Sequence, residues 1–281
     1  MSIDSFKTFP LSLCTTGMVP RKEQNANVPI SPNEIITQIL EIYEDFGLTS
    51  VHIHARREDQ SPAWEKVYFE KIIEGIRNSA PEIVICVTTS GRDVTEFEKR
   101  SEVLEISGSL KPDLASLTLS SQNFLKTASM NSPQMVRDLF QKMLSKDIIP
   151  EFEVFDTGMV NVLNELIKEF DYKRHPVVNL LLGNFAGIQT GPLELGFLME
   201  RIPNNSVWSV GGIGKHQLPA NALALSSGGG VRVGLEDNIF FDSQKTPATN
   251  YSLVSRVREI AALLGREIMK PDEFRELISI D

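Results

Sequence analysis

Short apolar segments alternate along the chain with longer amphipathic segments, and the alternation recurs about eight times. The segments whose apolar residues predict strands are Leu11 to Thr16, Ser50 to Ala55, Ile83 to Thr88, Leu114 to Leu119, Ile149 to Phe155, Val177 to Leu182, Ser206 to Val210 and Val231 to Val233. Apolar residues at helical spacing between them predict helices over residues 31–47, 63–77, 94–110, 132–145, 159–170, 193–199, 218–225 and 252–264.

The clearest helix start lies at Ser31. This residue is the expected N-cap, Pro32 takes the first helical position, and Glu34 completes a capping box. Gly47 marks the end of the same helix.

Strands that alternate with helices of this length are typical of parallel βα units. Eight such units predict an α/β fold, a (β/α)8 TIM barrel. No Pro- or Ser-rich linker divides the 281 residues, so residues 1–281 are expected to form a single domain. A doubly wound parallel sheet is the alternative, but no Gly-x-Gly-x-x-Gly motif follows the first strand.

Composition narrows the class of protein. The chain has 28 Lys and Arg against 37 Asp and Glu, a net charge of −9, and 41% hydrophobic residues, as in ordinary soluble globular proteins. The acidic balance argues against a nucleic-acid or anionic-membrane binder. Cys14 and Cys86 lie in apolar strand-like segments and are expected to be reduced core residues. No signal-peptide pattern and no apolar run of about 18 residues occur, so a cytoplasmic protein is expected.

Two of the four histidines, His52 and His54, lie at the end of the second predicted strand. Because side chains alternate along a strand, both imidazoles project to one face and can reach one metal ion at about 2.0–2.1 Å. Active sites of barrels lie at the C-terminal ends of strands, which favours a metal site over a pair of hydrogen-bonded polar residues. A third protein ligand is then needed.

The best candidate for that ligand follows the last predicted strand. Arg232 lies on this strand, and the adjacent acids Glu236 and Asp237 lie just beyond its end, at the same mouth of a closed barrel as the histidines. One carboxylate is expected on the metal and the other paired with Arg232, where it can serve as a base. A surface turn with solvated charges is the alternative.

Further polar groups end the neighbouring strands. Thr88 and Gly91 close the third strand, and Ser116 lies on the fourth. Hydroxyls and backbone N–H groups at such ends can hold a substrate carboxylate or an oxyanion. Glu153 interrupts an otherwise apolar fifth strand, and a buried acid needs a partner or a function.

These motifs together resemble the β-keto acid cleavage enzymes, the family that includes 3-keto-5-aminohexanoate cleavage enzyme, over nearly the whole chain. The motifs that carry the resemblance are Thr15-Thr16-Gly17, Pro29-Ile30-Ser31-Pro32-Asn33-Glu34, Val51-His52-Ile53-His54-Ala55-Arg56, Pro112-Asp113-Leu114-Ala115-Ser116-Leu117, Pro150-Glu151-Phe152-Glu153, Val210-Gly211-Gly212-Ile213-Gly214-Lys215 and Gly234-Leu235-Glu236-Asp237-Asn238-Ile239-Phe240. The early His-x-His together with the late Glu-Asp-Asn is the specific part of this combination.

The resemblance implies a barrel enzyme, usually a homotetramer, that binds Zn²⁺ through His52, His54 and Glu236. The family reaction combines a β-keto acid with acetyl-CoA and gives acetoacetate and a new acyl-CoA by a retro-Claisen-type step. In it, Asp237, tuned by Arg232, removes a proton from the methylene between ketone and carboxylate. The donor set itself also suits other divalent transition metals.

By matching motifs, the resemblance also assigns substrate contacts. Thr88 and Gly91 match positions that hold the substrate carboxylate, Ser116 stands where some members have threonine, and Glu153 matches an active-site glutamate. Members that act on an aminated keto acid carry a glutamate where this chain has Val19. An ammonium group against Val19 would lack a counter-charge, so a neutral or apolar side group is expected instead.

One more departure from the family pattern precedes Arg232. Members often have Gly-Gly-His there, whereas this chain has Gly229-Gly230-Val231, and the missing histidine enlarges the pocket.

Two other interpretations stay open. A metal-dependent hydrolase of the amidohydrolase kind also uses His-x-His in a barrel, but on the first strand and with further histidines from middle strands. Here the other histidines are His175 and His216, and only His216 follows the C-terminal end of a predicted strand. The second alternative is a non-catalytic barrel with a structural metal, which would not need Asp237.

Overall fold

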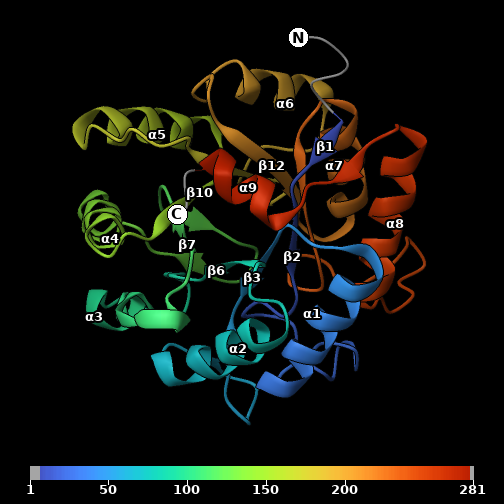
Figure 1. The fold of residues 1–281 in the computed structure, drawn as a ribbon. Helices are drawn as coiled ribbons and strands as arrows, with labels where there is room; N and C mark the ends of the chain where they lie inside the picture. Colours follow the sequence, from blue (N-terminus) through green and yellow to red (C-terminus); the bar gives the residue numbers. More distant parts are fainter. Residues whose placement is uncertain (1–6, 279–281) are drawn as a thin grey trace.

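The computed structural model describes residues 7–278, and its centre is a closed barrel of eight parallel strands (Figure 1). In order around the barrel the strands are β2 (Leu11–Cys14), β3 (Ser50–Ile53), β6 (Val84–Val87), β7 (Leu114–Thr118), β10 (Ile149–Val154), β11 (Val177–Leu182), β12 (Val207–Gly212) and β13 (Gly230–Val233). Strand β13 closes the ring by pairing with β2. The predicted TIM barrel is confirmed, and each of the predicted strands coincides with one of these.

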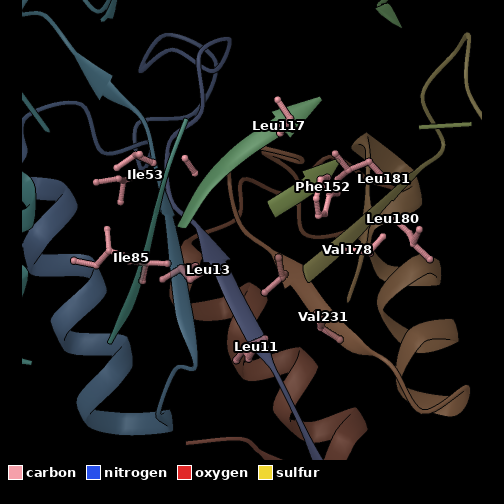
Figure 2. Close-up of a cluster of buried hydrophobic side chains, with 14 of the residues drawn as sticks. Leu11, Leu13, Ile53, Ile85, Leu117, Phe152, Val178, Leu180, Leu181 and Val231 are labelled. Atoms are coloured by element: carbon pink, nitrogen blue, oxygen red, sulfur yellow. The ribbon is translucent and has the colours of Figure 1, made fainter. Parts of the chain in front are cut away.

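Helices surround the barrel (Figure 1). They are α1 (Pro32–Phe46), α2 (Lys66–Ser79), α3 (Phe97–Arg100), α4 (Pro133–Ser145), α5 (Thr157–Glu169), α6 (Pro192–Met199), α7 (Gln217–Ser226) and α8 (Asn250–Leu263). Their apolar faces bury the outward side chains of the strands, among them Leu11, Leu13, Ile53 and Ile85 (Figure 2). Removal of this layer from water is the main stabilising contribution to the fold.

Helix α1 begins as the sequence predicts. The Ser31 hydroxyl accepts a hydrogen bond from the Glu34 backbone at 3.3 Å, and the Glu34 carboxylate accepts one from the Ser31 backbone at 2.9 Å. Gly47 caps the other end with φ 76°, a conformation that favours glycine. The capping box is therefore confirmed.

Side chains that point into the barrel are largely polar in its middle and toward the C-terminal ends of the strands. Buried members of this inner set are Ser12, His52, Ser116, Glu151, Glu153, Asn179 and Arg232. Polar groups buried in this way are costly unless they find partners. The inward-facing groups therefore need partners inside the barrel, while the outer apolar layer stabilises the fold.

The N-terminal end of the barrel is covered by a helix that follows β13 and α8 in the sequence. Helix α9 (Pro271–Ile278) lies across this opening, in front of the barrel in the view of Figure 1. A separate apolar cluster joins α9 to the N-terminal ends of the strands. The members of this cluster include Val84, Leu114, Ile149, Val177, Met269, Phe274 and Ile278. Strand β14 (Glu267–Ile268), just before α9, pairs with β1 (Thr8–Phe9). The sequence pattern predicted none of these three elements.

Some local predictions were wrong. The segment 94–110 is not one helix: α3 is followed by two 3₁₀ turns, Glu102–Glu105 and Gly108–Leu110, and Gly108 has φ 66°. Two short hairpins were also missed, β4 (Ala55–Arg56) with β5 (Pro62–Ala63), and β8 (Gln122–Asn123) with β9 (Ala128–Ser129). Helix α2 consequently starts at residue 66 rather than 63.

Two further expectations concern the cysteines and membrane-spanning segments. Cys14 and Cys86 are buried and unpaired, as predicted. Among the described residues, no helix combines the length and the hydropathy that crossing a membrane requires.

Candidate active site

A cavity of about 680 Å³ opens at the C-terminal ends of the barrel strands. Predicted site residues that line it are Val19, His54, Thr88, Glu153, Arg232, Glu236 and Asp237. Because successive strands deliver these groups to one end of the barrel, residues far apart in the sequence meet in a single space.

The three predicted metal ligands converge. His54 Nε2 lies 3.2 Å from Glu236 Oε1 and 3.2 Å from His52 Nε2, and His52 Nε2 lies 3.9 Å from Glu236 Oε1. Ligand atoms that surround a tetrahedral zinc ion at about 2.1 Å stand roughly 3.4 Å from one another. The triangle therefore has the size of one face of such a site, and a fourth position would open toward the cavity.

The environment of Glu236 also fits a cation. Its second oxygen, Oε2, is buried and has no hydrogen-bond partner among the described residues. An unsatisfied carboxylate oxygen is costly when it is buried without a cation or donor. The donor set of two imidazoles and one carboxylate is one that catalytic zinc sites use.

Two glycines allow Glu236 to reach this place. Gly234 turns the chain after β13 with φ 154°, and a Cβ there would collide with the carbonyl oxygen of Cys14. That carbonyl accepts a hydrogen bond from the Glu236 backbone at 3.2 Å. Gly17, with φ 63°, passes so close that a side chain would push against the Glu236 side chain. The loops after β2 and β13 therefore fit each other only with glycine at both positions.

Arg232 is fully buried beside the triangle and contacts both neighbouring acids. Its Nε donates to Asp237 Oδ2 at 3.0 Å, and its Nη2 donates to Glu236 Oε1 at 2.7 Å. Its Nη1 lies 3.9 Å from Glu153 Oε1. The sequence predicted a partnership with one acid, whereas the guanidinium holds Glu236 and Asp237 together.

The electrostatics separate the two acids. Burial raises the pKa of Asp237, although Arg232 opposes this, and the charge of Glu236 raises it further. Burial acts on Glu236 in the same direction, but Arg232 and the two imidazoles outweigh it and hold the pKa of Glu236 well below its ordinary range. Burial also keeps the pKa of His52 well below its ordinary value, so that imidazole is neutral. Glu236 is thus suited to be an ionised ligand and Asp237 to be the more basic carboxylate.

The chain matches a known protein family over nearly its whole length. A family model described as BKACE, beta-keto acid cleavage enzyme, matches residues 10–280. This chain belongs to the beta-keto acid cleavage enzyme family. The resemblance drawn from its motifs is confirmed.

Named relatives agree with this assignment, and a solved structure shares the fold. The 3-keto-5-aminohexanoate cleavage enzyme of Fusobacterium nucleatum is 33% identical over 94% of this chain and 95% of its own. The 3-oxoadipate:acetyl-CoA acetyltransferase of Cupriavidus necator is 32% identical over 96% of this chain and 94% of its own. The apo structure of ObcA matches with a TM-score of 0.80 at 18% identity, covering 90% of this chain and 65% of the longer ObcA chain, and shows a shared fold. The predicted enzyme class, a transferase acting with acetyl-CoA, is confirmed at this level.

In this β-keto acid cleavage enzyme, one of the residues predicted to contact the substrate carboxylate lines the cavity and another does not. Thr88 lines the cavity, as does Val19, whose side chain is exposed. Gly91 lies behind them: its carbonyl accepts a hydrogen bond from the Met130 backbone at 3.0 Å, and a Cβ would collide with the Arg100 guanidinium. Gly91 thus shapes the loop from outside the cavity lining.

Ser116 and Thr118 point the same way from β7 but at different depths. The Ser116 hydroxyl lies lower and accepts a hydrogen bond from the Thr89 backbone at 3.4 Å. Thr118 lines the cavity, and its hydroxyl donates to Glu153 Oε2 at 2.5 Å. Burial raises the pKa of Glu153. Thr118, which shares a strand face with Ser116, is thus the hydroxyl of this pair that reaches the cavity.

Another buried acid, Glu151, lies on β10 two residues before Glu153 and closer to the N-terminal end of the barrel. Glu151 Oε2 stands 3.7 Å from His52 Nδ1 and 3.6 Å from Cys86 Sγ, and burial raises the pKa of Glu151 to about 7. The three side chains are close enough to hold a metal ion. Burial raises the pKa of the Cys86 thiol well above its ordinary value, however, so the thiolate that a metal requires is disfavoured.

The remaining histidines lie apart from the triangle. His216 Nδ1 is 3.1 Å from the Thr190 hydroxyl, and His175 Nδ1 is 2.8 Å from the Asn205 carbonyl. Within residues 7–278, neither joins a group that could hold a metal ion. The additional histidines of an amidohydrolase-type site therefore have no counterpart in the described part of the chain.

Sequence reasoning missed Arg92 and Phe124. Both line the cavity, and the Arg92 guanidinium stacks on the Phe124 ring, 3.6 Å from its centroid. Arg92 could have been noticed, because it directly follows the polar end of the third predicted strand. Phe124 lies between β8 and β9, a hairpin that the sequence pattern did not reveal.

Proposed function

We propose that this family member catalyses R–CO–CH₂–COO⁻ + acetyl-CoA → R–CO–SCoA + acetoacetate, with zinc held by His52, His54 and Glu236. The observation that carries the proposal is the meeting of the three ligand atoms with the Arg232–Asp237 pair beside one cavity. Relatives named for keto acid cleavage and for acetyl-CoA transfer support the same reaction.

The metal and the base have separate tasks in this proposal. Bound zinc supplies Lewis acidity, which stabilises negative charge that develops on a carbonyl oxygen. Asp237, whose pKa burial raises, accepts the proton from the methylene group that lies between ketone and carboxylate. Arg232 keeps this carboxylate oriented through the 3.0 Å hydrogen bond from its Nε.

The subsequent steps balance without another reactant. The methylene carbon forms a bond to the acetyl carbon, CoA passes to the original ketone carbon, and the bond between that carbon and the methylene breaks. Asp237 then returns its proton to the departing acetoacetate. Neither an oxidant nor a water molecule is consumed, which suits a cavity whose lining is more apolar than polar.

Other residues hold the substrate in place. We assign the substrate carboxylate to Thr88, on the loop that Gly91 shapes from outside the cavity lining, with Ser116 supporting that loop through Thr89. Glu153, bonded to Thr118 and 3.9 Å from Arg232 Nη1, is assigned a catalytic role in tuning the charge around Arg232. The variable group R faces Val19, and it is not an amine, since no acid stands at that position.

Three coarser features belong to the same proposal. We propose that residues 1–281 form one barrel domain, since no linker divides the sequence, and that the enzyme works in the cytoplasm. The family resemblance adds a homotetramer. Light scattering after gel filtration should then give the mass of four 31.4 kDa chains. A monomer mass would contradict the assembly but not the reaction.

Turnover tests the proposed function directly. Purified enzyme, acetyl-CoA and a panel of β-keto acids should give acetoacetate and a new acyl-CoA by mass spectrometry, and a chelator should abolish both until zinc is restored. Product that forms at the same rate without acetyl-CoA would favour the hydrolase alternative. Silence across the panel, with metal bound, would favour a non-catalytic barrel.

A further inference from the structure

Arg92 is a cation of the cavity that the mechanism above does not use. It lies on the loop after β6, is half-buried, and lines the cavity together with Phe124. The Phe124 ring covers its guanidinium face at 3.6 Å, a stacking contact that fixes the plane of the group. The edge of the guanidinium, which carries the N–H donors, is left for other partners.

The donors of Arg92 have no partner in the described part of the chain. Its side chain forms no hydrogen bond and no ion pair there, and its Nε is buried without an acceptor. The acids whose charges act on Arg92 are Glu236, Asp93, Glu153 and Asp237. Three of them are bonded to Arg232 or Thr118. Asp93 is exposed, and within the described residues it forms no hydrogen bond or ion pair with Arg92. A half-buried guanidinium that has lost hydration and has no counter-ion is a binding site for an anion.

The position of Arg92 limits which anion this is. Two other cations that line the cavity, Lys126 and Lys215, are exposed, whereas Arg92 is half-buried under Phe124. A bulky diphosphate would more readily meet exposed cations than a group covered in this way. A small planar carboxylate matches the fork of donors that a guanidinium presents.

Building on the proposed function, we propose that Arg92 binds a second carboxylate, at the far end of the group R, so that the enzyme prefers β-keto dicarboxylates. This replaces the neutral or apolar side group that Val19 alone predicts with an anionic one; the exclusion of an amine stands. Val19 excludes an ammonium because it offers no acid, and Arg92 adds a further repulsion against any cationic end. An anionic end meets the unpaired guanidinium instead.

Two six-carbon substrates that differ only at the far end test the proposal. 3-Oxoadipate ends in a carboxylate and 3-oxohexanoate in a methyl group. With saturating acetyl-CoA, wild-type kcat/KM for the dicarboxylate should be larger by about 10-fold or more, the size of a charged hydrogen-bonded contact. Arg92→Gln should remove this preference through KM, because the contact lies away from the reacting atoms. Arg92→Lys should restore part of it.

Lys126→Gln is the matched control, since it removes the same charge from the same cavity and should leave the ratio of the two kcat/KM values within about twofold. Equal wild-type rates, or a preference for the methyl end, would overturn the assignment. An equal loss for both substrates in Arg92→Gln would move Arg92 to the common carboxylate, and a rise confined to the KM for acetyl-CoA would move it to CoA. Either result also refutes the proposal.

Binding without turnover keeps this test separate from the proposed reaction. Adipate should raise the Tm of the wild type more than hexanoate does, and Arg92→Gln should abolish the difference, because a ligand stabilises the folded state it binds. No difference in the wild type would overturn the Arg92 assignment. Absence of acetoacetate from every keto acid, with the adipate effect intact, would instead contradict the proposed function and leave Arg92 as an anion site.

Discussion

Asp237→Asn separates the role of this residue in catalysis from its role in structure. The side chain keeps its shape, and its amide oxygen can still accept from Arg232, which now donates to Asp237 at 3.0 and 3.4 Å. Arg232 also keeps its 2.7 Å bond to Glu236. The amide oxygen can keep the 3.0 Å bond, now to a neutral acceptor, whereas the NH₂ group cannot accept, so the 3.4 Å bond is lost. The structural cost is about 2 kcal/mol.

The effect on the rate should be much larger. A positioned base contributes about 10²- to 10⁴-fold, and even the lower limit raises the barrier by about 2.7 kcal/mol. Because the three metal ligands are untouched, metal content should remain that of the wild type. Turnover should therefore fall at least 100-fold in a folded, metal-loaded enzyme.

The assay combines acetoacetate formation with elemental analysis and a denaturant titration of the same sample. Asp138→Asn is the control: it is the same chemical change on α4, where the carboxylate accepts a hydrogen bond from the Gln134 side chain and lies outside the cavity lining, so the rate should be unchanged. Asp237→Asn enzyme with full metal and a rate within about threefold of the wild type would refute the role of this residue as base.

Three further substitutions test other parts of the account. Glu236→Ala should release most of the bound metal by removing one of three ligands, and full occupancy by elemental analysis would exclude Glu236 from the ligand set. Val19→Glu should shift selectivity toward keto acids that carry an amine, because it supplies the missing counter-charge, and unchanged kcat/KM ratios would mean that Val19 does not face the group R. Gly234→Ala should lower the free energy of unfolding by about 2 kcal/mol or more, since its Cβ would collide with the Cys14 carbonyl, and a loss below about 0.5 kcal/mol in denaturant titration would contradict that geometry.

The parts of the fold that the sequence predicts are those in which the signal is local. The capping box at Ser31 lies within four residues, and the apolar strands carry their own pattern. The sequence pattern does not predict helix α9 because its apolar residues have no partner nearby in the sequence. They pack on the N-terminal ends of five strands. The segment 94–110 was assigned as one helix because its apolar spacing outweighed the break at Gly108.

In the candidate site, too, the sequence predicts some features, and others depend on contacts between distant segments. His52 and His54 were recognisable because a strand repeats every two residues, and Glu236 because it follows the last strand. The joint contact of Arg232 with two acids depends on the turn at Gly234, which the sequence pattern does not specify in three dimensions. Arg92 is held in its place by stacking on Phe124, which the β8–β9 hairpin brings over it. Such contacts between loops are the part that spacing along the chain cannot provide.

The fate of the acetyl carbons tests the central claim most directly. Acetyl-CoA labelled with ¹³C at both acetyl carbons is incubated with the zinc-loaded enzyme and an unlabelled β-keto acid, and both products are analysed by mass spectrometry. The account predicts that both labelled carbons appear in acetoacetate and none in the new acyl-CoA. Unlabelled acetoacetate, or a new acyl-CoA that carries the label, would contradict it.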